Sequence, residues 1–151
     1  MAVCGFSAGD LKSPASAEIG KARGTYVLML RLVEETHIRV GRLGEFSFPA
    51  GHYLYVGSSQ GSGGLAARIA RHRRAEKRLH WHIDYLTRCA DVIDVWYVES
   101  PRHLECVVAE AIAALPGAGV LVPGFGSSDC RCPAHLFYFP GLPDLAMLCM
   151  N

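Results

Sequence analysis

The sequence has no hydrophobic run long enough to cross a membrane. Its longest apolar stretches, residues 26–30 and 92–98, are far shorter than the ~20 residues that a transmembrane helix needs. The first 16 residues also lack the basic segment and apolar block that mark a signal peptide. We therefore expect no membrane association and a cytoplasmic location.

The chain also lacks a large excess of charge, because 15 Lys and Arg balance 14 Asp and Glu to give a net charge of +1. This balance excludes a protein that attracts nucleic acid over its whole surface. The positive charge is local instead, since residues 68–78 contain six basic residues and the single acid Glu76. A solvated helix face is the simpler interpretation of such a cluster. The alternative, which we predict, is a nucleic-acid-binding face formed by Arg71, Arg73, Arg74, Lys77 and Arg78.

Paired C-x-x-C motifs, the usual sign of a zinc knuckle, are absent although the chain has six cysteines. In an intracellular protein these cysteines would be reduced thiols or metal ligands rather than a disulfide framework. Cys130, Cys132 and His135 form a C-x-C-x-x-H segment with ligand types that suit structural zinc. Small buried cysteines in a tight loop are the competing interpretation. The fourth ligand would be one of three residues: Cys106, Cys89 or His103.

Length and composition indicate one globular domain without internal repeats. The chain has 151 residues, of which 50% are hydrophobic and 19% charged. Residues 1–22 contain Gly, Ser, Ala and Pro without sustained periodicity, which predicts a flexible N-terminal arm. We expect the folded domain over residues 23–139 and a C-terminal tail over residues 140–151.

The order of strand and helix patterns predicts an α+β fold with a small, mostly antiparallel β-sheet flanked by helices. Alternating or β-branched stretches predict strands at 26–33, 36–40, 46–48, 52–56, 91–97 and 135–139. Apolar residues at helical spacing predict helices at 65–72 and 80–86, and a third that begins at Pro101.

Two short motifs of glycine and tyrosine lie in predicted strands. The first is Gly24-Thr25-Tyr26 and the second is Tyr55-Val56-Gly57. A helical arginine and then a helical glutamate follow them along the chain. This order resembles the GIY-YIG endonuclease superfamily, most closely its Uri-type branch. The resemblance implies a GIY-YIG nuclease domain over residues 23–139, with the two tyrosine strands paired at its centre.

The sequence departs from the usual family pattern in several respects, including the lack of a clear match for an asparagine that many relatives carry after the glutamate helix. Thr25 stands where isoleucine is usual, although it keeps a β-branched residue in the strand. More residues separate Tyr26 from Tyr55 along the chain than form the short hairpin of many relatives. We expect an additional strand pair within residues 36–48 to take up this length, as in the Uri-type branch.

The resemblance also implies which residues act. Its catalytic set in this chain is Tyr26, Tyr55, Arg68, His72 and Glu105. Glu105 would hold Mg²⁺ or Mn²⁺, Arg68 would steady the scissile phosphate, and either Tyr26 or His72 would handle the proton of the attacking water. Glu110 competes with Glu105 for the metal. We favour Glu105 because it lies near the start of the helix and because its neighbours Leu104 and Cys106 resemble the Uri-type pattern more closely.

These expectations lead to one main functional hypothesis and two alternatives. The main hypothesis is a metal-dependent endonuclease that hydrolyses phosphodiester bonds in DNA, single-stranded or branched substrates included, during repair or nucleic-acid processing. One alternative is a non-catalytic nucleic-acid-binding module that keeps the same scaffold. The other is a structural protein stabilised by zinc.

Overall fold

The computed structural model describes residues 11–12, 19–128 and 130–150, so most of the predicted N-terminal arm lies outside the described residues. The strands are β1 (Gly24–Leu32), β2 (Thr36–Val40), β3 (Gly44–Phe48), β4 (Gly51–Ser59), β5 (Asp91–Glu99) and β6 (Leu136–Phe139). The helices are α1 (Gly64–Arg73), α2 (His82–Thr87) and α3 (Glu105–Ala113), with short 3-10 segments at Gly41–Leu43 and Leu145–Met150.

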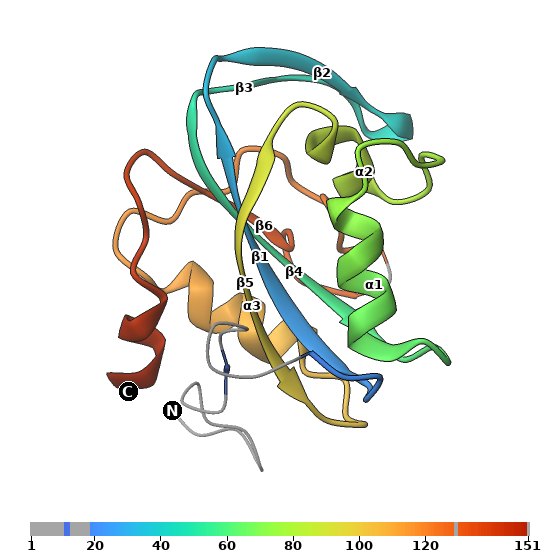
Figure 1. Ribbon diagram of the computed structural model, residues 1–151. Coiled ribbons are helices and arrows are strands. Elements are labelled where there is room, and N and C mark those ends of the chain that lie inside the picture. The colour runs from blue at the N-terminus through green and yellow to red at the C-terminus, as the bar shows by residue number, and fades with distance from the viewer. Residues whose placement is uncertain (1–10, 13–18, 129, 151) are drawn as a thin grey trace.

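Four strands form an antiparallel sheet in the order β5-β1-β4-β6. The two tyrosine strands, β1 and β4, are therefore neighbours at its centre, and Tyr26 lies opposite Gly57 in their register. Figure 1 shows α1 and α2 on one face of this sheet and α3 on the other. The predicted α+β class, with a small antiparallel sheet flanked by helices, is confirmed.

Each face of the sheet packs into its own hydrophobic core. Successive side chains of a strand point to opposite faces, so Tyr26 and Leu28 pack with α1 and α2. Val27 and Met29 pack with α3 on the far face. Because β1 is buried on both faces, its sequence is a continuous apolar run rather than an alternating one.

The strands β2 and β3, which lie between β1 and β4 in the sequence, form a separate two-stranded sheet. Its side chain Phe48 is fully buried in the core shared with α1 and α2. The pair takes up the long spacing between the two tyrosines without disturbing the register of β1 and β4. The expected additional hairpin is therefore present.

The third helix begins later than predicted. We expected it to start at Pro101, but α3 begins at Glu105. The segment before it forms a turn in which the backbone N–H of Arg102 donates to the Ser100 hydroxyl at 3.1 Å. Because the turn precedes the helix, Glu105 lies at the start of α3 and not in its interior.

Both terminal segments contain residues that pack against the domain. Leu11 is buried, and Lys12 forms an isolated β-bridge with Tyr97. In the predicted C-terminal tail, Leu145 and Leu148 are buried in the core around α3. Among the described residues, no helix has the length and apolarity needed to cross a membrane.

Candidate active site

Tyr26 and Tyr55 lie on the same face of the central strands. Their ring centroids are 6.5 Å apart, because Tyr26 in β1 lies two register positions from the partner of Tyr55 in β4. Burial raises the pKa of Tyr26 well above its ordinary value of 10.0, and the nearby Tyr55 adds to this shift while Arg68 opposes it. Burial likewise raises the pKa of Tyr55. Both residues are therefore neutral phenols near pH 7.

Helix α1 brings His72 against Tyr26. The Tyr26 hydroxyl and the His72 Nε2 atom are 2.6 Å apart, and only 2% of His72 is exposed. Burial lowers the pKa of His72 from 6.5 to about 3, and Lys77 adds to this shift. His72 is thus a neutral hydrogen-bond partner of Tyr26 and lies behind it rather than on the surface.

Arg68 lies one helical turn before His72 on the same face of α1. Its Nη1 donates to the backbone carbonyl of Ser58 at 3.2 Å, and its guanidinium stacks on the Trp81 ring at 4.1 Å from the centroid. A guanidinium has five N–H donors. The N–H groups that do not donate to Ser58 allow Arg68 to bind an anion.

The edge of the sheet allows a residue from the opposite face to reach this group. Strand β6 pairs with β4 only as far as Tyr55, and beyond it the N–H of Val56 donates to the carbonyl of His135. Here Glu105, in the first turn of α3, approaches the tyrosines around the end of β6. Its side chain is 20% exposed, and its carboxylate lies 3.8 Å from Nδ1 of His103.

These residues surround a single pocket with a volume of about 510 Å³. Four of the five residues in the predicted catalytic set line it, and the fifth, His72, contacts it through Tyr26. The lining residues are Tyr26, Tyr55, Val56, Gly57, Ser58, Arg68, Trp81, His103, Glu105, Cys106, Gly126, Cys130 and His135. Hydroxyl, guanidinium, carboxylate and imidazole groups therefore face one cavity of a size that a nucleotide can enter.

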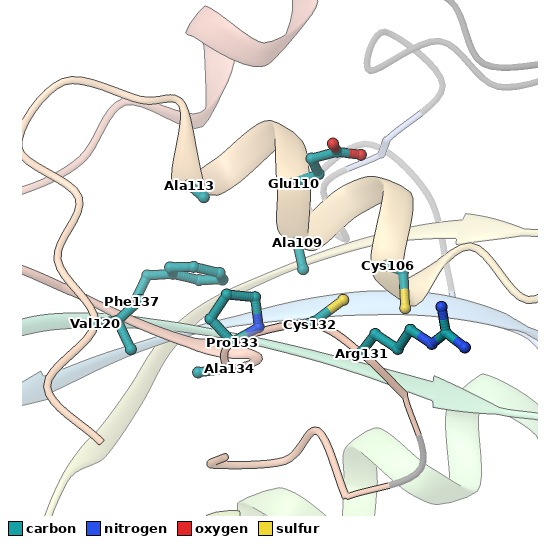
Figure 2. Close-up of a pocket in the computed structure, with 10 residues that line it drawn as sticks. All are labelled: Cys106, Ala109, Glu110, Ala113, Val120, Arg131, Cys132, Pro133, Ala134 and Phe137. Carbon is teal, nitrogen blue, oxygen red and sulfur yellow. The ribbon is translucent and has the colours of Figure 1, made fainter. Parts of the chain in front are cut away.

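The alternative carboxylate, Glu110, lies in a different place. It lines a second pocket of about 490 Å³ with Ala109, Ala113 and Phe137. Figure 2 shows mostly apolar side chains around this pocket, with the Glu110 carboxylate directed away from Phe137. The tyrosines and Arg68 do not line it. Of the two acids, only Glu105 lies among the other predicted catalytic residues.

The predicted nucleic-acid-binding residues fall into two groups. Arg71 forms a paired hydrogen bond with the fully buried carboxylate of Asp84, at 2.9 and 3.0 Å. Lys77 donates to the carbonyls of Arg71, His72 and Arg74 at the end of α1. These two side chains hold the fold. The exposed members are Arg73, Arg74 and Arg78.

Asp84 organises the segment that follows the basic helix. Its carboxylate also accepts hydrogen bonds from the backbone N–H groups of His80 and Trp81. Burial alone would raise the pKa of Asp84, but the hydrogen bonds from Arg71 and the backbone outweigh this effect and lower it. The network fixes Trp81, whose ring Arg71 also stacks on at 4.2 Å. The Trp81 ring is therefore in contact with two arginines and helps to hold Arg68 in place.

The cysteine segment converges with α3 beside the pocket. One ligand atom each of Cys106, Cys130, Cys132 and His135 lies within 4.8 Å of the other three. Burial raises the pKa of the Cys132 thiol to about 12, and the neighbouring thiols of Cys106 and Cys130 add to this shift. Cys130 and His135 also line the pocket of the tyrosines. The group has the residue types and the proximity of a possible metal-binding cluster.

Comparison with known proteins gives one match. A family model described as "Domain of unknown function DUF123" matches residues 25–150, which is most of the chain. The protein belongs to the DUF123 family. This family is GIY-YIG-like, in agreement with the central pairing of the two tyrosine strands. No curated protein and no solved structure matches the chain.

Two features of this DUF123 protein could not be predicted from the sequence, and a third was left open. The contact between Arg68 and Trp81 joins α1 to the residue that precedes α2, and no spacing rule indicates it. Arg71 forms hydrogen bonds with Asp84, 13 residues away, and the cluster of basic residues in the sequence gives no sign of this partner. Cys106 was one of three open choices for the fourth thiol or imidazole, and its place in the first turn of α3 decides between them.

Proposed function

We propose that this protein is a divalent-metal-dependent endonuclease that hydrolyses phosphodiester bonds in DNA, in repair or nucleic-acid processing. One observation carries the proposal: Tyr26, Tyr55, Arg68 and Glu105, from four different elements, line a single pocket. Membership of the GIY-YIG-like DUF123 family supports it. The hairpin β2–β3 between the tyrosine strands also favours the Uri-type branch within that superfamily.

Arg68 would bind the scissile phosphate. Its guanidinium is held by the Ser58 carbonyl and the Trp81 ring, so little conformational entropy is lost when it meets the anion. A cation placed in advance also stabilises the negative charge that develops on the phosphoryl oxygens. Exposed Arg73, Arg74 and Arg78 would contact phosphates farther along the strand.

Tyr26 would contact the attacking water. Tyr26 lines the pocket, whereas His72 does not and lies behind it, with its Nε2 atom 2.6 Å from the Tyr26 hydroxyl. The phenolic oxygen can accept the proton of water while its own proton is shared with Nε2 of His72. Because burial holds the pKa of His72 at about 3, its imidazole is neutral and available for this hydrogen bond near pH 7.

Glu105 would hold the divalent cation. Mg²⁺ and Mn²⁺ prefer oxygen ligands and often bind through one or two carboxylates together with substrate phosphate. The Glu105 carboxylate is partly exposed in the pocket and lies near Tyr55, whose pKa it helps to raise. When bound, the cation supplies positive charge to the phosphoryl and leaving oxygens.

The direct test is cleavage of labelled single-stranded, duplex and branched DNA in the presence of Mg²⁺ or Mn²⁺. Wild type should cut at least one substrate, and Arg68→Ala should lower the rate by about 10²- to 10³-fold. Glu105→Ala should abolish metal-dependent cutting, while the matched variant Glu110→Ala should cut like wild type. A folded wild type that binds these DNAs but cuts none would favour the non-catalytic binding module.

A further inference from the structure

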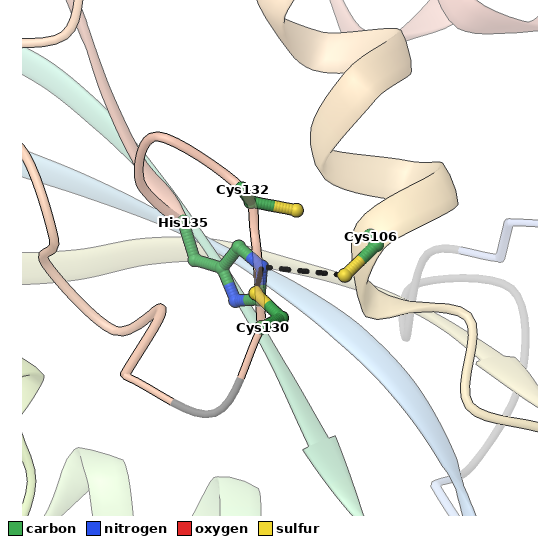
Figure 3. A group of neighbouring side chains, drawn as sticks. All are labelled: Cys106, Cys130, Cys132 and His135. Carbon is green, nitrogen blue, oxygen red and sulfur yellow. Dashed lines mark hydrogen bonds between the residues drawn. The ribbon is translucent and has the colours of Figure 1, made fainter.

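Three thiols and one imidazole meet beside the proposed active site, and each comes from a structured part of the chain. Cys106 lies in the first turn of α3, whereas the other three belong to the segment before β6. Figure 3 shows their side chains directed toward one another. The His135 Nε2 atom lies 3.4 Å from the Cys130 sulfur and 4.0 Å from the Cys106 sulfur.

These separations suit a tetrahedral zinc ion. Zinc bonds of about 2.3 Å to sulfur and about 2.0–2.1 Å to nitrogen give ligand-to-ligand edges of roughly 3.4–3.8 Å. The four ligand atoms lie within 4.8 Å of one another, so shifts of less than about 1 Å would complete the tetrahedron. Binding of the ion would therefore require only small movements of these side chains and their backbone.

The ligand types select the metal. Three sulfur atoms and one nitrogen suit zinc and do not suit Mg²⁺, which requires oxygen ligands in octahedral geometry. A set of three cysteines and one histidine fills all four positions of zinc, which is the arrangement of structural sites. The cluster is therefore chemically distinct from the carboxylate site at Glu105.

The surroundings show what such an ion would hold. The described residues between α3 and β6 form no helix or strand. Backbone hydrogen bonds such as that from the His135 N–H to the Phe125 carbonyl hold them, together with one from the Gly126 N–H to Nδ1 of His82 at 2.9 Å. The N-cap residue of α3, Leu104, provides no side-chain cap. A metal bound to Cys106 would join the start of α3 directly to this segment.

We propose that Cys106, Cys130, Cys132 and His135 bind one Zn²⁺ ion that fastens the start of α3 to the segment before β6. Since Glu105 precedes Cys106 in the first helical turn, the ion also positions the Glu105 carboxylate at the edge of the sheet. This second consequence rests on the proposed nuclease function. The zinc site itself does not.

Metal content of the full-length protein tests the site without any activity measurement. Protein produced with zinc in the medium and purified without chelator should contain about one zinc per chain by elemental analysis. Replacement by Co²⁺ should give the intense visible absorption of tetrahedral cobalt and the near-ultraviolet band of cobalt–thiolate bonds. Removal of zinc by a chelator should lower the melting temperature by roughly 10 °C or more.

Substitutions locate the metal within the chain. Cys132→Ser and Cys106→Ser should each reduce zinc content to traces and remove the cobalt–thiolate band. Cys89→Ser is the matched control, since Cys89 is an exposed free cysteine outside the cluster. It should keep full zinc content and the cobalt spectrum.

Several results would overturn the site. They are a wild type that purifies folded with no zinc and takes up none when zinc is added, a cobalt spectrum without thiolate bands, or a disulfide among the three cysteines in freshly purified protein. Loss of DNA cleavage with full zinc content would instead contradict only the nuclease proposal. Protein from which zinc has been removed and which still cleaves DNA at the wild-type rate would contradict only the positioning of Glu105 by the ion.

Discussion

The ring of Tyr26 lies directly against the backbone of Gly57, its partner in the register of β1 and β4. A Cβ atom on Gly57 would lie 2.5 Å from both the Cζ atom and the hydroxyl of Tyr26. The glycine of the second motif is therefore required by the tyrosine of the first. Packing against Tyr26 is therefore one reason for a glycine at position 57. A glycine there would also allow a phosphate to approach the backbone closely.

Replacing Gly57 by alanine should displace the Tyr26 hydroxyl. The added methyl group cannot be accommodated unless the ring moves, which should cost about 1–3 kcal/mol of folding free energy. If Tyr26 contacts the attacking water, cleavage should fall by about 10²-fold because small misplacements of reacting groups are costly. Single-turnover cleavage and thermal unfolding measure the two effects.

Gly61→Ala is the matched control, because among the described residues no heavy atom beyond its two chain neighbours lies within 4 Å of a Cβ placed at Gly61. It should cleave at the wild-type rate. Unchanged cleavage by Gly57→Ala would show that the position of the Tyr26 hydroxyl does not matter to the reaction.

Burial of His72 predicts a specific dependence of stability on pH. Its pKa is lowered from 6.5 to about 3 in the folded protein, so the unfolded chain binds this proton more readily. The contribution of neutral His72 is therefore present above pH 6.5 and is lost as the pH falls toward 3. The free energy of unfolding should decline through this window by an amount on the order of a few kcal/mol.

His72→Gln separates this effect from other titrations. Glutamine keeps a neutral hydrogen-bond partner for Tyr26 but does not titrate. The variant should lose less stability than wild type between pH 6.5 and pH 3 in urea unfolding experiments. Parallel curves for the two proteins would mean that His72 is not held neutral by burial.

The basic helix should contribute to DNA binding through its exposed residues only. Arg73→Ala, Arg74→Ala and Arg78→Ala should each weaken binding of every sequence and reduce the slope of log K against log salt by about 1. Arg71→Ala should instead destabilise the fold by about 3 kcal/mol, because it leaves the buried Asp84 carboxylate without its cation. Fluorescence anisotropy at several salt concentrations and thermal unfolding distinguish the two classes. Equal salt slopes for wild type and the exposed-arginine variants would contradict a binding role for this face.

The fold could be predicted from the sequence because its signals are local. The apolar run in β1 and the hairpin β2–β3 were expected near their observed positions, as was the helix that carries Arg68. The sheet order was not evident from these signals, since it depends on which strand pairs with each edge of β1 and β4. The start of α3 was placed too early because Pro101 suits a helix and equally suits the turn that the structure shows.

The candidate site was predictable only in part. Tyr26, Tyr55, Arg68 and Glu105 could be named from motif order, and the pocket brings these four together. Motif order could not decide between Tyr26 and His72, because only the fold shows that His72 lies behind Tyr26. It also could not identify Cys106 as the fourth member of the cysteine cluster, since that depends on how α3 approaches the segment before β6.

The most direct test of the proposed function is to compare Glu105→Gln with Glu110→Gln in Mn²⁺-dependent cleavage of a DNA substrate that wild type cuts. Both variants remove one negative charge from α3, and the two residues line different pockets. We predict that Glu105→Gln still binds the DNA but loses metal-dependent cleavage, whereas Glu110→Gln cleaves like wild type. Equal cleavage by the two variants, at any level, would contradict Glu105 as the carboxylate that holds the catalytic metal.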